Sequence, residues 1–139
     1  MTKWLISLIC LSIFNWQDAR CQVQSIAGTW QFRFDSLPRF SPIEMPGSCE
    51  ERGFGTRSDF RDPHRLTRAV RYVGKAWYKK EIIVPESWRG KRLELFFERC
   101  MWETAAWIDG RPVGMRNSLS TPHLYDLGII KPGRHSILV

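Results

Sequence analysis

The chain has 139 residues, of which 43% are hydrophobic and 25% are charged, and this composition excludes a disordered protein. The length suffices for one domain with a core of its own and is too short for two. The formal net charge is +7, but the basic residues are scattered. We therefore interpret the excess as a solvated basic surface and predict no nucleic-acid partner.

The N-terminal segment predicts export. Lys3 precedes an apolar run over residues 4–16, which is too short to span a bilayer, because a spanning helix needs about 20 residues. A positive start, a short apolar run and a small-residue site at Ala19–Cys21 are the parts of a signal peptide. We expect residues 1–21 to be this signal peptide and residues 22–139 to form the domain.

Export implies a periplasmic or extracellular protein with no membrane span. The alternative is a lipoprotein in which Cys21 is acylated. The charged residues Asp18 and Arg20 disfavour it, since such a site needs small apolar residues at those positions.

Beyond residue 25 the apolar residues recur with a period of two, which is typical of strands. Trp30, Phe32 and Phe34 alternate with polar residues in the first segment. The predicted strands cover residues 28–35, 76–85, 92–98, 104–109, 111–114, 121–128 and 135–139.

Two connections stand out among these strands. Asp109-Gly110 predicts a two-residue hairpin turn, because both residues tolerate a positive φ. Residues 36–75 are rich in Pro, Gly, Asp and Arg and lack periodicity, so we expect a long loop that is functional or packed on the sheet.

Short antiparallel strands with regular turns predict an all-β fold, a β-sandwich or jelly roll. The last strand, HSILV, stops without a terminal cap. We therefore expect the domain to be truncated at its C-terminal end.

Two cysteines, Cys49 and Cys100, follow the signal peptide. Export and the even count permit a disulfide between them, and two free thiols are the alternative. The histidines are not spaced as metal ligands and there is no CxxC motif, so we predict no metal and no cofactor.

Six stretches stand out in chain order: AGTWQFRFD (27–35), MPGS (45–48), YVGKAWYKKEIIVPESWRGKRLELFFERC (72–100), WETAAWIDGRPVG (102–114), STPHLYDLG (120–128) and KPGRHSILV (131–139). Together they resemble the N-terminal sugar-binding domain of glycoside hydrolase family 2, the β-galactosidase-like enzymes. The resemblance implies a jelly roll of the galactose-binding-domain-like type. It also implies that an immunoglobulin-like domain and a catalytic (β/α)8 barrel with two glutamates follow.

The chain itself is expected to carry no catalytic residue. A retaining glycosidase needs two carboxyl groups in different environments on either side of the bond. Glu94 and Glu98 instead lie on the polar face of a predicted strand, where solvated charge explains them.

A sugar site combines an aromatic ring with planar polar side chains. The candidates gather near predicted strand ends: Arg99, Trp102, Glu103, Asn117, Ser118, His123 and Tyr125. A core position for Trp102 and a structural role for His123 are the alternatives. By strand alternation, we expect Trp30, Trp77 and Trp107 to be core residues.

The sequence thus predicts a non-catalytic β-sandwich domain of an exported glycoside hydrolase. Its partners would be a glycan substrate and the downstream domains, and it would serve as scaffold and contribute to the substrate rim. A stand-alone secreted carbohydrate-binding module and a β-sandwich adhesion module are the alternatives.

Overall fold

The computed structural model describes residues 21–61, 63–64 and 67–139. Apart from Cys21, the predicted signal peptide lies outside the described residues. The described part consists of β-strands and one short 3-10 turn, η1 (Glu86–Trp88). Within it, no helix is long and apolar enough to cross a membrane.

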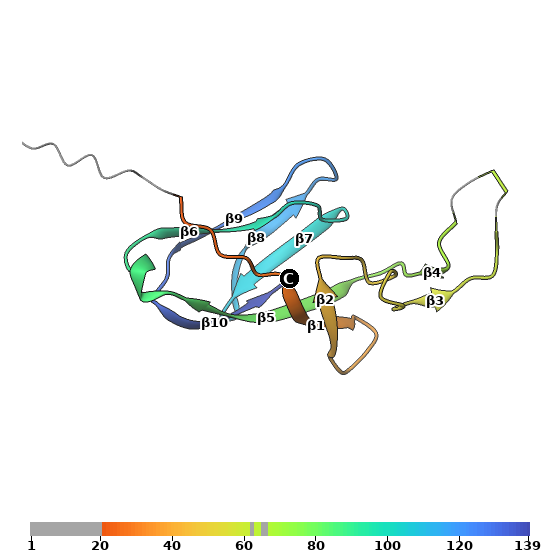
Figure 1. Cartoon of the computed structure of the whole chain (residues 1–139), viewed down its shortest axis with the longest axis horizontal. Coiled ribbons are helices and arrows are strands. Elements are labelled where there is room, and N and C mark those ends of the chain that lie inside the picture. Colours follow the sequence, from red (N-terminus) through yellow and green to blue (C-terminus); the bar gives the residue numbers. More distant parts are fainter. Residues whose placement is uncertain (1–20, 62, 65–66) are drawn as a thin grey trace, which may run out of the picture.

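The strands form one large sheet and two small ones (Figure 1). The large sheet has the order β2-β1-β5-β10-β7-β8, and the pairs β6-β9 and β3-β4 form the others. The strands are β1 (Gly28–Phe34), β2 (Ser41–Met45), β3 (Thr56–Arg57), β4 (Val70–Arg71), β5 (Ala76–Val84), β6 (Arg92–Phe97), β7 (Glu103–Ile108), β8 (Arg111–Asn117), β9 (His123–Ile129) and β10 (Gly133–Leu138).

The core lies between the six-stranded sheet and the β6-β9 pair. Aromatic rings meet across these two layers: Trp30 of β1 lies 6.3 Å from Phe97 of β6, centroid to centroid. The alternation predicted for β1 is confirmed, because Trp30, Phe32 and Phe34 are all buried. This arrangement confirms the all-β sandwich expected from the sequence.

The prediction that Trp77 and Trp107 are core residues is wrong. Ala106 and Ile108 are buried, so Trp107 between them points to the outer face of the six-stranded sheet. Trp77 lies on the same face, and its ring contacts that of Trp107 at a centroid distance of 5.7 Å. A period of two fixes which residues share a face but not which face is buried.

The segment 36–75 is only partly the loop that its composition indicated. β2 pairs with β1 along Gly28–Phe32 and extends the large sheet. Beyond it, Tyr72 returns to the core and stacks on Phe34 at 3.5 Å. The small β3-β4 ribbon extends away from the sandwich (Figure 1).

The predicted Asp109-Gly110 hairpin is confirmed. Ile108 pairs with Arg111 at the ends of β7 and β8, and the two turn residues have φ values of 50° and 78°. Positive φ at both positions is what a type I′ turn requires. The Asp109 carboxylate also accepts hydrogen bonds from the Ser136 N–H (2.8 Å) and from His135 (2.6 Å).

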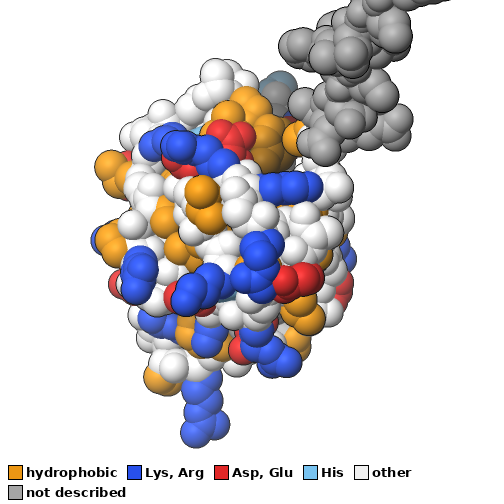
Figure 2. Space-filling model, turned by 90° about the vertical axis from the view of Figure 1, so that its left-hand side faces the viewer, with side chains coloured by type: hydrophobic (Ala, Val, Ile, Leu, Met, Phe, Trp, Pro, Cys, Tyr) orange, Lys and Arg blue, Asp and Glu red, His pale blue; other side chains and the backbone are white. Residues whose placement is uncertain are grey.

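The basic side chains lie among acidic ones on the surface. Figure 2 shows a face on which Lys and Arg side chains lie among acidic and apolar ones. Ion pairs account for part of this mixture: Arg92–Asp126, Arg134–Glu81, Arg89–Glu86 and Arg68–Glu50. These groups are mostly exposed, which agrees with a solvated surface.

Candidate functional site

The sequence-predicted sugar residues gather where two loops meet at one end of the sandwich (Figure 1). One loop joins β6 to β7 and the other joins β8 to β9. The Ser118 N–H of the second loop donates to the Trp102 carbonyl of the first, at 3.0 Å. The strands β7 and β8 end side by side here, because Glu103 pairs with Asn117.

Trp102 is an exposed residue. Its relative exposure is 65%, so the core alternative is wrong. Its φ of 78° is a left-handed backbone conformation that a bulky residue rarely adopts. Strained backbone of this kind is concentrated at binding and catalytic sites, which favours a functional role for the indole.

A polar pair accompanies this ring. The Asn117 amide donates to the Glu103 carboxylate at 3.3 Å, and both side chains are exposed. Arg99, in the same loop as Trp102, is exposed as well. These three are planar groups of the kind that bind vicinal hydroxyls.

His123 and Tyr125 do not face solvent as the sugar prediction required, and Ser118 is only partly exposed. His123 is 1% exposed and Tyr125 is fully buried. Ser118 Oγ accepts hydrogen bonds within its own loop, from the N–H groups of Ser120 (3.3 Å) and Thr121 (3.1 Å). His123 and Tyr125 therefore support the two loops from the core, while the Ser118 hydroxyl stabilises the loop that joins β8 to β9.

The buried pair is joined by Thr104. Its hydroxyl lies 2.5 Å from His123 Nδ1 and 2.6 Å from the Tyr125 hydroxyl. The other histidine nitrogen, Nε2, lies 3.0 Å from the Ser118 carbonyl. Because a carbonyl only accepts, Nε2 carries a proton, and in the neutral ring Nδ1 then accepts from the Thr104 hydroxyl. Burial raises the pKa of Tyr125.

Two exposed apolar residues lie in the same two loops as Trp102 and Ser118, and the sequence analysis did not select them. Met101 is 74% exposed and Leu119 is 67% exposed. Together with Trp102 they form what we call the loop-tip patch. No periodic pattern in the sequence points to these residues. Their position in loops beside strand ends was the only indication that they could belong to a binding site.

The carboxylates of the described residues are all exposed to some degree. His123 is the only buried polar or charged residue among them, so every described carboxylate is at least partly solvated. A retaining pair requires one carboxyl group kept protonated in an apolar setting. The described residues also include no group of three or more potential metal ligands.

The disulfide considered for Cys49 and Cys100 is not formed. Both thiols are free. Cys49 Sγ lies 3.7 Å from the Glu50 carboxylate. Burial raises the pKa of both thiols.

Comparison with known proteins identifies β-glucuronidases as similar to this chain. No family model matches it. The chain is similar to a β-glucuronidase of Paenibacillus borealis, with 23% identity over 127 residues, 83% of this chain and 20% of the relative. It therefore spans about a fifth of the length of this curated relative.

Solved structures agree on the fold. The β-glucuronidase of Ruminococcus gnavus aligns over 83% of this chain and 20% of its own, with a TM-score of 0.65 and 24% identity. Its complex with D-glucuronic acid gives the same TM-score and identity, covering 21% of that chain. At this level of identity the likeness shows a shared fold.

Proposed function

We propose that the chain is the N-terminal, non-catalytic jelly-roll domain of an exported family 2 glycoside hydrolase that acts on β-glucuronides. The observation that carries the proposal is the coverage: 83% of this chain aligns with 20% of a β-glucuronidase. A piece of this size matches one domain of a multidomain enzyme. The all-β sandwich with only solvated carboxylates supports a scaffold role.

In this proposal the loop-tip patch contributes to the rim of the substrate site. Trp102 supplies an exposed ring, and the Glu103–Asn117 pair supplies hydrogen-bonding groups beside it. A second candidate, a stand-alone carbohydrate-binding module, is favoured by the same exposed ring. The two differ in whether a catalytic barrel belongs to the same polypeptide.

The first test is the coding sequence downstream of Val139. We expect it to encode an immunoglobulin-like domain and a barrel with two glutamates. The second is hydrolysis of 4-nitrophenyl β-D-glucuronide. We expect turnover by the complete polypeptide and none by the 139-residue chain. An unrelated downstream sequence, or turnover by this chain alone, would refute the proposal.

The rim role has its own test in the complete polypeptide. Trp102→Ala should raise KM for a β-glucuronide about tenfold and leave kcat less affected, because binding rather than chemistry loses a contact. The matched control is Ile129→Ala, which removes another exposed apolar side chain (70% exposed) far from the two loops. An unchanged KM for Trp102→Ala would exclude the rim role.

A further inference from the structure

The outer face of the six-stranded sheet carries a second group of sugar-compatible side chains. β1 and β5 are antiparallel, with Arg33 opposite Trp77 and Gln31 opposite Lys79. Side chains two residues apart on a strand share a face, so these four residues form one continuous surface. This face is separate from the loop-tip patch, which lies at the strand ends.

The aromatic part of this surface is fixed in position. The Trp77 Nε1–H donates to the Asp35 carboxylate at 2.7 Å. The Arg33 guanidinium carbon lies 5.5 Å from the Trp77 ring centroid, within the range of a cation–π contact. The ring of Trp107 follows at 5.7 Å with a 40° tilt. Two oriented indoles thus lie partly open on a sheet face.

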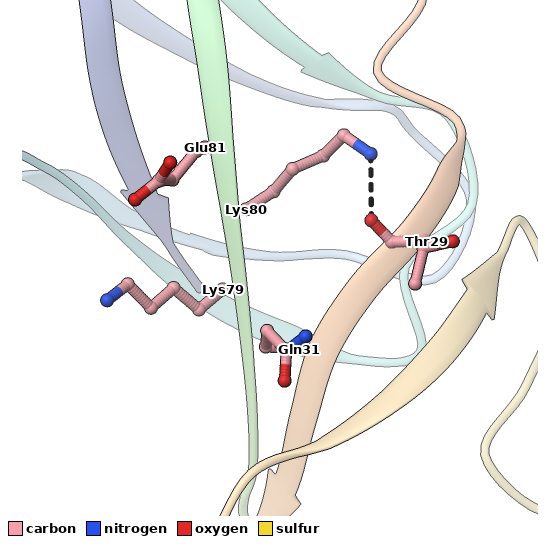
Figure 3. A pocket seen from close by; sticks show the side chains of 5 residues that line it. All are labelled: Thr29, Gln31, Lys79, Lys80 and Glu81. Carbon is pink, nitrogen blue, oxygen red and sulfur yellow. Dashed lines mark hydrogen bonds between the residues drawn. The ribbon is translucent and has the colours of Figure 1, made fainter.

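A polar cavity of about 360 Å³ continues the surface along the strands (Figure 3). Its lining comes from β1 and β5, and it opens where their pairing ends beyond Gln31 and Lys79. Lys80 bridges the diverging strands by donating to the Ala27 (3.2 Å) and Thr29 (2.9 Å) carbonyls. The cavity is lined by Thr29, Gln31, Lys79, Lys80 and Glu81.

The charges around the cavity favour an anion. Lys79 has no hydrogen bond or ion pair within the part of the chain that the structure describes. The nearby Glu81 carboxylate is already paired with Arg134 at 2.9 Å. Arg33 is bound only to backbone carbonyls and rings. The free Lys79 ammonium therefore offers donors to a carboxylate, and the Gln31 amide lines the same cavity from β1 (Figure 3).

We propose that this outer face binds an oligosaccharide that contains uronic acid residues. Trp107 and the part of Trp77 that Arg33 leaves open contact the apolar C–H face of one sugar ring. Lys79, about 7 Å further along the sheet than Trp77, pairs with the carboxylate of a neighbouring ring. The proposal concerns a binding surface on the sheet and stands whether or not the chain belongs to a glycosidase.

The test compares two tetrasaccharides on the purified protein, tetragalacturonate and the neutral galactotetraose. Titration calorimetry gives affinities, and ¹⁵N-labelled indole resonances, assigned with single Trp→Phe variants, locate the site. We expect tetragalacturonate to bind about fivefold to tenfold more tightly at low salt and to shift the Trp77 indole signal. This preference should shrink in 0.5 M NaCl, because salt screens an exposed charge.

The decisive variant is Lys79→Gln, which removes the charge at an exposed strand position. It should weaken tetragalacturonate binding about tenfold, as for loss of a charge-assisted hydrogen bond, and leave galactotetraose binding unchanged. Trp77→Ala should weaken both, provided its melting curve shows a folded protein. Lys91→Gln, on the turn before β6, is the matched control and should change neither affinity.

Three results would overturn the proposal. One is that neither saccharide binds. Another is equal affinity of the Lys79→Gln variant and the unmodified protein for tetragalacturonate. The third is a set of shifts confined to the Trp102 indole, which would place the ligand on the loop-tip patch and leave the sheet face unoccupied.

Discussion

Replacement of Thr104 by valine tests whether the buried Thr104–His123–Tyr125 network stabilises the sandwich. Valine keeps the shape of threonine but neither donates nor accepts a hydrogen bond. The hydroxyl serves two partners, His123 Nδ1 at 2.5 Å and the Tyr125 hydroxyl at 2.6 Å. Tyr125 retains a bond to the Thr104 carbonyl at 2.7 Å, so His123 loses most.

The size of the effect follows from burial. His123 is 1% exposed, so water does not replace the lost donor to Nδ1. A buried polar group that is left without its partner costs about 1–3 kcal/mol. We expect Thr104→Val to lower the free energy of unfolding by about 2–3 kcal/mol. For a domain of this size, this lowers Tm by about 6–10 °C.

Urea denaturation followed by tryptophan fluorescence measures the difference. Thr104→Ser is the matched control, because it keeps the hydroxyl and loses one methyl group, which costs about 1 kcal/mol or less. If the valine variant is as stable as the serine variant, the assignment of Nδ1 as an acceptor held by Thr104 is wrong.

Three further changes probe other parts of the chain. Asp109→Asn should cost about 0.5–1 kcal/mol near pH 5.5 and little above pH 8, as measured by urea titration at both values. The hydrogen bond between the two side chains raises the pKa of His135 and lowers that of Asp109. The stabilisation by this ion pair is therefore fully present between about pH 4, the ordinary pKa of Asp, and about pH 6.5, the ordinary pKa of His. Phe32→Ala should cost about 3–5 kcal/mol in guanidinium denaturation, because its ring is buried among other aromatic rings. Cys49 and Cys100 should react with iodoacetamide at pH 7.5 only after the protein is unfolded, because burial raises both thiol pKa values. The reaction should need no reductant, and peptide mass spectrometry identifies the labelled cysteines.

Each of these has an internal comparison. Phe96→Ala removes a ring that is 52% exposed and should cost less than about 1 kcal/mol. In the full 139-residue chain with residues 1–21 retained, the exposed Cys21 should be labelled while the protein is folded. A constant difference between Asp109→Asn and the unmodified protein from pH 5.5 to pH 8 would contradict the ion-pair argument. Labelling of Cys49 and Cys100 that requires reductant would reveal a disulfide.

The sequence predicted the architecture well because the fold depends on local patterns. In β1 the residues Trp30, Phe32 and Phe34 alternate with polar neighbours, and all three are buried. The Asp109-Gly110 turn also follows from two residues that tolerate a positive φ. Neither inference requires knowledge of what lies on the other side of the core.

The sequence predictions were wrong where they depended on which face of a strand is buried. In β9, His123 and Tyr125 are buried while Leu124 between them is 43% exposed, the reverse of what hydrophobicity favours. The inversion is stable because Thr104, nineteen and twenty-one residues away along the chain, satisfies both polar groups. A partner this distant in sequence has no local signal.

The residues chosen from the sequence as sugar ligands divide into an exposed set and the framework that holds it. The Ser118 carbonyl accepts from His123 Nε2 (3.0 Å), while the Ser118 N–H donates to the Trp102 carbonyl (3.0 Å). Hydrogen bonds therefore link the buried Tyr125 through Thr104, His123 and Ser118 to the backbone carbonyl of Trp102. A residue with a strained backbone conformation needs such support, because the surrounding structure must offset the strain. The burial of His123 and Tyr125 thus removes them as ligands and makes them part of the framework that holds the backbone of Trp102.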